Sequence, residues 1–308
     1  MLDQATYLFM KYVSAHGKNY DTVEEFNRRL AIFLDTHAFI EERNATNSSY
    51  RAGFNQFSDW SHEEKDKLLG LKGFEATLSD DLFVGAANAS SKDWRDVTDV
   101  VTPVKNQGAC GSCWAFSATE AVESAYVIAG NEQVIMAPQE LVDCSRGLLS
   151  NHGCNGGMYY HAWDWLKSHK SMRETDYPYT SGTTGDETEC AYDESKGVTN
   201  VSGYQQASPD SESIKAAIEI GPCSVAVAAG NDVFMNYSSG IVTEDDGCPT
   251  RIDHAILAVG YGYEGDQGYY IVRNSWDTTW GESGYIRIGM GDGDGVCGIN
   301  QVVYYPII

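Results

Sequence analysis

The stretch Gln107-Gly108-Ala109-Cys110-Gly111-Ser112-Cys113-Trp114-Ala115-Phe116 joins a turn of small residues to the start of an apolar segment. The pattern predicts a helix from about Cys113 to Ala129, with Gly130 as its C-cap. A cysteine at the N-terminal end of a helix lies at the positive end of the helix dipole, which favours the thiolate over the thiol. Cys113 is therefore a candidate nucleophile.

Two later segments supply the groups that such a nucleophile needs. His254 precedes an apolar run that reads as a strand, and Asn274 follows another such run. A reactive thiol requires a base, a group that orients the base and donors for an oxyanion. Either residue alone would more often be structural, but their occurrence together with Cys113 favours a catalytic set. Cys110-Gly111-Ser112-Cys113 also fits a redox or zinc motif, but neither further paired ligands nor a thioredoxin-like context follows.

Taken together, these segments resemble the active-site motifs of papain and the cathepsins, in the same order and at compatible spacing. Gly153-Cys154-Asn155-Gly156-Gly157 and Trp280-Gly281-Glu282-Ser283-Gly284-Tyr285 extend the resemblance over residues 93 to 308. It implies an α+β protein with a helical left domain, a β-barrel-like right domain and a cleft between them. The implied catalytic residues are the thiolate–imidazolium pair, the Asn that orients the imidazole and the Gln that donates to the oxyanion: Cys113, His254, Asn274 and Gln107.

The same resemblance implies a substrate-binding set: Gly156, Gly157, Met158, Tyr159, Ala226, Asp253, Ala255, Trp276, Trp280 and Val302. The two glycines would form backbone hydrogen bonds with an extended peptide. Five others, namely Met158, Tyr159, Ala226, Ala255 and Val302, would line an apolar S2 pocket. We therefore expect Leu, Phe or Val rather than Arg at P2. The chain lacks the His-bearing insertion of carboxydipeptidase relatives, so we expect endopeptidase activity. Asp277 stands where relatives often have glycine, which puts the local turn in doubt.

The N-terminal region has its own signature. A helix is predicted from about Thr22 to Asn44, and Glu25 follows Thr22 at the spacing of a capping box. Two motifs resemble those of cathepsin L-like propeptides: Glu25, Arg29, Phe33, Ile40 and Asn44, then Gly53, Asn55, Phe57 and Asp59. Thr36 replaces an Asn of the first motif. The resemblance implies a zymogen with an inhibitory propeptide over residues 1–88, a helical globule followed by an extended tail through the cleft from about Phe74, and a catalytic domain over residues 89–308. Protonation of His16, His37, His62 and carboxylates is expected to weaken docking.

Eight cysteines in this chain suggest disulfides formed in an oxidising compartment. Sequence spacing alone leaves the connectivity open. The family resemblance pairs Cys110 with Cys154, Cys144 with Cys190 and Cys248 with Cys297, which leaves the thiol of Cys113 free. The remaining cysteine, Cys223, is expected to be a buried inert thiol.

Composition limits the partners. The chain has 21 basic and 44 acidic residues, a net charge of −23 that would repel nucleic acid. No apolar run is long enough for a membrane helix, and Met1-Leu2-Asp3-Gln4 lacks signal-peptide character, so any leader is expected to be missing from this chain. We expect a monomer that acts on proteins and peptides, with no cofactor and no metal. The segment Gly291–Gly295 lacks the later acidic ligand of a calcium loop.

Five sequons begin at Asn44, Asn47, Asn88, Asn200 and Asn236, which agrees with a secretory route. The predicted location is a lysosome or another acidic vacuole, or the outside of the cell. The alternative function is a catalytically silent binding or storage protein. The usual mark of such a protein is a lost nucleophile or base, and here both are present.

Overall fold

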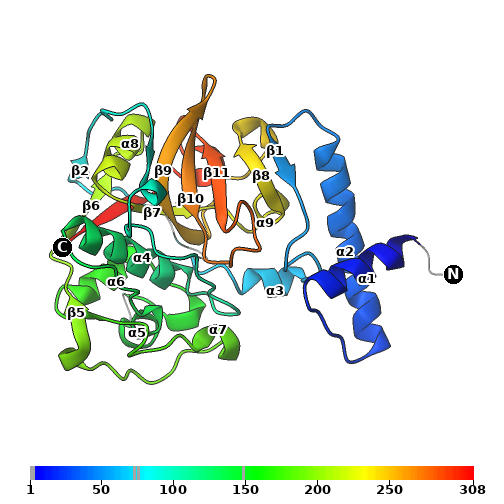
Figure 1. Ribbon diagram of the computed structural model, residues 1–308, viewed down its shortest axis with the longest axis horizontal. Helices are drawn as coiled ribbons and strands as arrows, with labels where there is room; N and C mark the ends of the chain where they lie inside the picture. Colours follow the sequence, from blue (N-terminus) through cyan, green and yellow to red (C-terminus); the bar gives the residue numbers. More distant parts are fainter. Residues whose placement is uncertain (1–3, 72–73, 75–76, 148–149) are drawn as a thin grey trace.

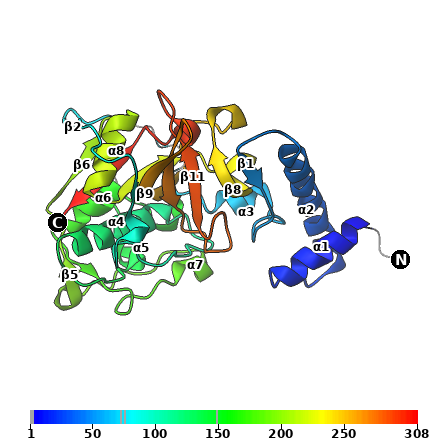
Figure 2. The ribbon, with the colours of Figure 1, turned by 45° about the horizontal axis from the view of Figure 1, so that its top comes forward.

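A computed structural model describes residues 4–71, 74, 77–147 and 150–308. Residues 1–3 of the predicted propeptide and residues 75–76 of its predicted tail lie outside the described residues. Figure 1 shows a pair of helices at one end of the molecule, a twisted sheet in the middle and a group of helices below and beside the sheet. The view in Figure 2 shows the same separation of the N-terminal helices from the rest.

The N-terminal pair consists of α1 (Gln4–Ala15) and α2 (Val23–Asn44). Helix α2 begins where predicted, because the Thr22 side chain accepts a hydrogen bond from the Glu25 N–H at 3.1 Å. The Glu25 carboxylate pairs with Arg28 and Arg29 instead of completing a capping box. The two helices pack around a small aromatic core of Phe9, Tyr12 and Phe33. This region therefore has a core of its own.

Short elements join this region to the sheet. Strand β1 (Tyr50–Ala52) pairs antiparallel with β8 (Tyr237–Val242), and α3 (His62–Asp66) follows. Helix α3 has a complete capping box between Ser61 and Glu64. Gly240, at φ +89°, admits the close approach of β1, since a Cβ there would lie 2.1 Å from the Ser49 carbonyl oxygen. One edge of the sheet thus belongs to the N-terminal region.

The helical part contains α4 (Cys113–Ile128), α5 (Pro138–Cys144), α6 (Tyr159–Leu166) and α7 (Ser181–Thr184), with the two-stranded sheet β4 (Ser171–Met172) and β5 (Gly197–Thr199). The helix predicted from about Cys113 to Ala129 is confirmed, since α4 ends one residue earlier, at Ile128. The first twelve residues of α4, Cys113 to Ser124, are all buried. Helix α4 is therefore the central element between the helices and the sheet.

The main sheet follows the order β1-β8-β11-β10-β9-β7-β12-β6-β2, with β3 paired to β9. Its remaining strands are β2 (Leu82–Phe83), β3 (Lys92–Asp93), β6 (Gly203–Ala207), β7 (Cys223–Val227), β9 (His254–Glu264), β10 (Gln267–Arg273), β11 (Tyr285–Gly289) and β12 (Val303–Ile307). Two helices, α8 (Ser211–Ile220) and α9 (Asp232–Met235), pack beside it. The two apolar runs that were predicted as strands, after His254 and before Asn274, are confirmed as β9 and β10.

Both ends of this strand order, β1 and β2, come from the N-terminal region. The chain between them must therefore cross the molecule from one edge of the sheet to the other. Short 3-10 turns complete the fold at Trp94–Asp96, Gly153–Asn155, Glu194–Lys196, Glu244–Asp246 and Val296–Gly298. The α+β architecture with a helical part and a sheet part agrees with the prediction.

The three expected disulfides are present: Cys110–Cys154, Cys144–Cys190 and Cys248–Cys297. Cys113 and Cys223 are free and buried. No helix in the described ranges combines the length and apolar character that crossing a membrane requires.

Candidate active site

Cys113 is the first residue of α4, and its side chain is fully buried. Its Sγ accepts a hydrogen bond from the Ala255 N–H at 3.4 Å. The turn before it depends on Gly111, where a Cβ would lie 2.5 Å from the Cys154 carbonyl oxygen. Glycine and the Cys110–Cys154 disulfide together fix the approach of this turn to the 154–157 segment. The thiol is thus held at the helix start, as the sequence predicted.

His254 opens β9 and meets Asn274 just after β10. The Nε2 of His254 lies 2.8 Å from the Asn274 Oδ1, so the ring nitrogen donates to the amide oxygen. The other ring nitrogen, Nδ1, is buried and has no hydrogen-bond partner in the described part of the chain. The Trp276 ring lies over the imidazole, with 4.7 Å between ring centroids. This arrangement leaves Nδ1 as the nitrogen that can take a proton.

Gln107 is oriented by two donors. Its Oε1 accepts hydrogen bonds from the Ser275 hydroxyl at 2.8 Å and the Trp276 indole N–H at 3.1 Å. The amide nitrogen Nε2 must then point the other way, where it donates to the carbonyl oxygens of Leu68 and Cys110, both at 2.8 Å. The role of Ser275 was missed from the sequence, although it lies inside the Asn-Ser-Trp motif. Gln107 therefore presents a fixed donor beside Cys113.

Residues 68–71, which we call the covering segment, lie directly over this site. Gly157 N–H donates to the Gly70 carbonyl at 2.9 Å, and Leu71 N–H donates to the Asp253 carbonyl at 3.0 Å. A Cβ on Gly70 would lie 2.9 Å from the Cys113 Sγ and 2.3 Å from the Gly111 carbonyl oxygen. The thiol is thus in contact with the chain's own backbone, at a place that only a glycine fits.

The covering segment corrects one expectation. The resemblance implies a tail that enters the cleft from about Phe74, but the residues that lie over the thiol are Leu68 to Leu71. Further along, residues 82–83 pair with β6 at the far edge of the sheet. The reason is topological, because β1 and β2 hold opposite edges and the stretch halfway between them must span the middle.

The residues predicted to line an apolar pocket come together. Met158, Ala226, Ala255 and Val302 belong to one buried cluster, and Leu71 of the covering segment is part of it. The Tyr159 hydroxyl donates to the Val302 carbonyl at 2.6 Å, so its polar end is satisfied inside that cluster. Trp280 packs edge-on against Trp276, with 5.4 Å between ring centroids.

Burial decides the protonation of the covered pair. Burial raises the pKa of the Cys113 thiol to about 11, against smaller opposing effects of backbone N–H groups such as that of Ala255. Burial also lowers the pKa of His254 to about 4, although its hydrogen bond with Asn274 opposes the shift. Both shifts favour a neutral thiol and a neutral imidazole in the covered site. A neutral thiol is a poor nucleophile, so covering also deactivates chemically.

A buried charge network connects the elements that carry the site. Arg273, adjacent to Asn274 and fully buried, lies 3.0 Å from the Glu120 carboxylate of α4. Lys105 lies 2.5 Å from Glu123, one helical turn further along α4. Sequence reasoning missed this network, although two acidic residues inside an apolar helix were a visible signal.

This network reaches the oxyanion donor as well. Segment 105–107 runs beside 275–277, with hydrogen bonds from the Gln107 N–H to the Ser275 carbonyl at 2.9 Å and from the Asp277 N–H to the Lys105 carbonyl at 3.0 Å. Asp277 adopts a left-handed conformation at φ 68°, which aspartate tolerates better than most residues. Asp277 therefore does not disturb the local turn, since segment 275–277 keeps its backbone hydrogen bonds with segment 105–107.

The first N-terminal motif holds α2 to the elements after it. Arg29 pairs with Glu25 at 2.7 Å and with Glu64 of α3 at 2.6 Å. Asn44 forms two hydrogen bonds with the backbone of Ala52. The other members, including the substituted position, are buried: Phe33, Thr36 and Ile40. The motif thus fixes the positions of α3 and β1 relative to α2.

The second motif contacts the sheet side of the site. Gly53 N–H donates to the Asn236 carbonyl, and the Asn55 amide donates to the Met235 carbonyl at 2.7 Å. The Phe57 ring packs edge-on against Trp276, with 5.4 Å between centroids. Asp59 is buried and accepts a hydrogen bond from the Tyr12 hydroxyl at 2.7 Å. The second motif therefore contacts the same tryptophan that shields His254.

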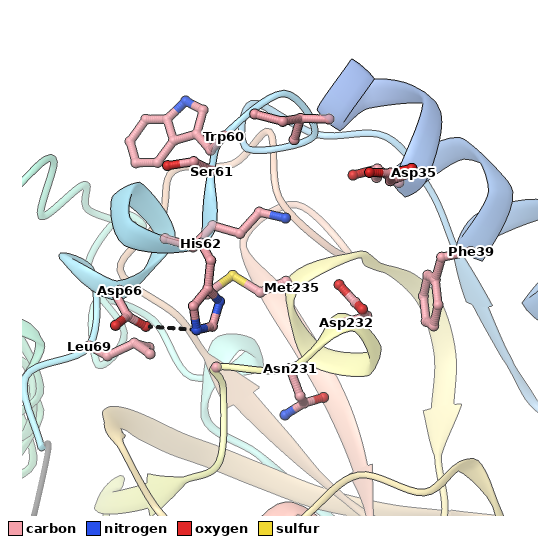
Figure 3. A pocket seen from close by; sticks show the side chains of 14 residues that line it. Asp35, Phe39, Trp60, Ser61, His62, Asp66, Leu69, Asn231, Asp232 and Met235 are labelled. Carbon is pink, nitrogen blue, oxygen red and sulfur yellow. Dashed lines mark ion pairs between the residues drawn. The ribbon is translucent and has the colours of Figure 1, made fainter. Parts of the chain in front are cut away.

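A cavity of about 430 Å³ lies on the seam between α2, α3 and α9. Figure 3 shows the side chains of Asp35, His62, Asp66 and Asp232 around it, with Phe39 on the α2 side. The imidazole of His62 lies 3.8 Å from Asp66. Polar groups therefore line part of this seam, in contrast to the dry packing around Cys113. In the described ranges no three His, Cys, Asp or Glu side chains are placed to hold a metal ion.

A thiol at a helix start, an imidazole oriented by an amide and a covering stretch of the same chain define the class of cysteine peptidase precursors. Comparison with known families agrees. The model of the papain family cysteine protease matches residues 88–307, and that of the cathepsin propeptide inhibitor domain matches residues 9–64. The chain belongs to the papain family of cysteine proteases and carries a propeptide inhibitor domain of the cathepsin type.

Individual relatives support the assignment over the whole chain. The chain is 38% identical to a cathepsin L-like proteinase of Phaedon cochleariae over 98% of its length and 93% of the relative's. It is also 38% identical to mouse pro-cathepsin H, over 97% and 90% of the two lengths. Digestive procathepsin L 3 of Tenebrio molitor superposes with a TM-score of 0.87 at 34% identity, covering both chains fully. Cathepsins of this family are typically lysosomal, vacuolar or secreted.

Proposed function

We propose that this chain is the zymogen of an endopeptidase in which Cys113 attacks the peptide carbonyl and His254 acts as the base. The observation that carries the proposal is the set Cys113, His254, Asn274 and Gln107 lying together under residues 68–71 of the same chain. With the cover removed, water reaches the pair and the burial that keeps both groups neutral is lost. Thiolate and imidazolium then become accessible.

In the proposed reaction the thiolate attacks the scissile carbonyl and the oxyanion is held by the Gln107 amide and the Cys113 N–H. The imidazolium gives its proton to the leaving amine, and a thioester acyl-enzyme remains. Water then hydrolyses the thioester with His254 as base. Asn274 keeps the ring oriented through Nε2 without adding charge, and Trp276 excludes water from that contact.

The covering segment inhibits because it occupies the hydrogen-bonding groups of the site that would bind a substrate, but runs through the site in the opposite direction. Gly157 and Asp253 bind the peptide group between Gly70 and Leu71, while the carbonyl at Gln107 belongs to the earlier residue Leu68. A substrate running in the opposite direction presents its scissile carbonyl after the bound peptide group. Residues 68–71 therefore fill the site without offering a bond to the thiol. We assign residues 1–88 to this propeptide and residues 89–308 to the catalytic domain.

The proposed P2 preference is Leu, Phe or Val. It is supported by Leu71, which shares the apolar cluster of Met158, Ala226, Ala255 and Val302. None of these lining side chains offers a carboxylate to an Arg. A library of peptide substrates measures the preference, and a higher kcat/KM for Arg than for Leu at P2 would contradict it.

We further propose an acidic vacuole, a lysosome or secretion as the location. Of the five sequons, Asn47 is the best acceptor for a glycan because it is exposed and its amide has no hydrogen bond with the described residues. By contrast, four side-chain amides donate hydrogen bonds within the fold, those of Asn44, Asn88, Asn200 and Asn236.

Active-site labelling tests the function. After acid treatment, an epoxide or vinyl-sulfone inhibitor should label Cys113, and peptide hydrolysis should be lost in proportion to labelling. The Cys113→Ala protein should neither label nor hydrolyse peptides. The matched control is Cys223→Ala, which removes the other free thiol and should keep both properties. A silent binding or storage protein would show no labelling in any of the three.

A further inference from the structure

The segment between the propeptide and the catalytic domain is anchored at two points. Upstream, Leu82 and Phe83 pair with β6, and downstream Lys92 and Asp93 pair with β9. Between them, residues 84–88 have no regular structure, and the Val84 side chain is 76% exposed. Ala86 and Ala87 make no hydrogen bond to any described residue. An irregular stretch between two fixed points, with consecutive residues that form no hydrogen bond, is a preferred site for proteolysis.

Just after this stretch, the Glu219 carboxylate of α8 binds the backbone. Both carboxylate oxygens accept a hydrogen bond from the Asn88 N–H, each at 3.0 Å, and one of them accepts from the Ala89 N–H at 2.7 Å. The Tyr261 hydroxyl donates to the same carboxylate at 2.7 Å or to the Ala89 carbonyl at 2.9 Å. The Asn88 side chain adds a contact at 3.3 Å. Within the described ranges, Glu219 forms no ion pair.

We propose that Glu219 is the receptor for the amino terminus created by hydrolysis of the Ala87–Asn88 bond, which moves the boundary of the mature enzyme one residue upstream of the 88/89 boundary assigned by resemblance. Water adds across this bond, so that Ala87 leaves as a carboxylate and the nitrogen of Asn88 becomes an ammonium group. The new charge forms at an atom that already lies 3.0 Å from both oxygens of Glu219. A hydrogen bond to a neutral amide is thereby replaced by a charge-assisted ion pair.

Two observations support this bond rather than its neighbours. The match to the peptidase family begins at residue 88, so the part shared with that family starts at the residue that Glu219 binds. The hydrogen bonds of Glu219 also begin at Asn88, so the backbone is held by hydrogen bonds from residue 88 onward, whereas Ala86 and Ala87 form none with the described residues. Cleavage after Ala87 places Ala86 at P2, a small apolar residue that the proposed S2 pocket accepts.

The lysines near Glu219 interact with other groups, so its carboxylate is available to pair with the new amino terminus. Lys215 on the same helix is paired with Glu212 at 2.7 Å and donates to the Tyr263 hydroxyl at 2.9 Å. Lys92 on β3 lies 3.6 Å from the centre of the Trp94 ring. Burial opposes ionisation of Glu219, but the Asn88 N–H, the Tyr261 hydroxyl and the Ala89 N–H outweigh it and lower its pKa to about 2. The carboxylate is therefore charged at the pH of an acidic vacuole.

The inference rests on the proposed zymogen function, and the first measurement separates the two. Acid-matured protein is sequenced from its amino terminus, and its peptidase activity is measured in the same sample. Active enzyme that begins at Asn88 supports the inference. Active enzyme that begins at another residue overturns the inference and leaves the function standing, whereas a protein that never matures or labels overturns both.

The second measurement tests the ion pair itself in mature wild-type, Glu219→Gln and Glu212→Gln enzymes. The pKa of the terminal amine is obtained from the pH dependence of its acetylation, followed by mass spectrometry. We expect a value about 0.5 to 1 unit above the ordinary 7.7–8.0 in wild type and in Glu212→Gln, and an ordinary value in Glu219→Gln. Equal values in all three enzymes would overturn the receptor role.

Thermal unfolding provides the third measurement. Glu219→Gln should lower the Tm of the mature enzyme by about 2 °C, and of the zymogen by less, because the ammonium exists only after cleavage. Glu212 lies on the same helix, α8, and is paired with Lys215. Glu212→Gln should therefore change the Tm of the zymogen and of the mature enzyme equally. A loss of Tm in Glu219→Gln that is the same before and after maturation would show a purely structural carboxylate.

Discussion

Two seams meet at the active site, and they are built differently. The seam between α4 and the sheet is closed by large apolar side chains and by the fully buried Glu120–Arg273 pair. The seam between the propeptide and the sheet combines a three-residue strand, the Arg43–Asp246 ion pair and a smaller set of buried side chains such as Tyr50 and Phe57 with a cavity that has an acidic lining. Figure 1 shows α1 and α2 at one end of the molecule, with α3 below the sheet.

The difference teaches how one chain can hold a stable enzyme and a removable inhibitor. The first seam must survive maturation because it positions Cys113, Gln107 and Asn274 relative to one another. The second seam must open, so it relies on backbone hydrogen bonds and on contacts that acid can weaken. Four changes test this contrast, from the largest expected effect to the smallest.

Arg273→Leu should damage the permanent seam most. It removes the closest cation of the buried Glu120 carboxylate and leaves only Lys105, 3.9 Å away; breaking a buried ion pair in this way costs about 3–5 kcal/mol of the free energy of unfolding. Denaturant unfolding of the mature enzyme measures the loss. Arg287→Leu is the matched control, because its pair with Glu282 is partly exposed and its removal should cost about 1 kcal/mol or less. Similar losses in the two variants would contradict the proposed importance of the buried network.

Acid should open the removable seam through His254. Its pKa is lowered to about 4 when covered, whereas an unburied imidazole titrates near 6.5. In the Cys113→Ala zymogen no thiol can give its proton to the ring, so the uncovered imidazole takes its proton from solvent. Covering of this variant is therefore fully stable above about pH 6.5 and is weakened as the pH falls towards 4. The equilibrium should shift by up to tenfold per pH unit, or roughly 3 kcal/mol over this window.

Cleavage of the Cys113→Ala zymogen by added mature enzyme measures the opening without self-processing. Rates at pH 4.5, 5.5 and 6.5 are divided by the activity of the added enzyme on a small peptide at the same pH. A corrected rate that does not rise on acidification would rule out His254 as an acid-sensitive group in release.

Gly70→Ala should loosen the covering segment. A methyl group at this position would lie 2.3 Å from the Gly111 carbonyl oxygen and 2.9 Å from the thiol, so the backbone must move away. The rate at which an epoxide inhibitor labels Cys113 in the intact zymogen at neutral pH should rise about tenfold, equivalent to about 1.4 kcal/mol. Gly147→Ala is the control, since its Cβ meets the nearest atom at an ordinary 3.5 Å. Unchanged labelling in Gly70→Ala would mean that the segment accommodates the methyl group.

Thr22→Ala should have the smallest effect. It removes the side chain that caps α2, at a cost of about 1 kcal/mol of stability in the propeptide helices. We expect a lower Tm for the zymogen in a calorimetric scan. The mature enzyme made from the same variant lacks α2 and serves as the internal control, so its Tm should match that of wild type. A shift in the mature enzyme would disprove the independence of the two regions.

Much of the site was predictable because it depends on local chemistry and on motifs. The start of α4 at Cys113 follows from small residues before an apolar run, and the roles of His254, Asn274 and Gln107 follow from their resemblance to a known set. The buried network was not predictable in the same way. Glu120 and Arg273 are 153 positions apart, and nothing local in either segment reveals its partner.

The sequence by itself predicted the proposed nucleophile and its companions, the disulfide partners through resemblance and the capped helix from Val23 to Asn44. These features depend on residue type, spacing and periodicity over short stretches. Only the tertiary structure decided that residues 68–71, rather than those after Phe74, lie over the thiol, and that the covered pair is neutral. Both outcomes depend on strand pairing and burial between segments far apart in the chain, and these are properties of the folded molecule rather than of any one segment.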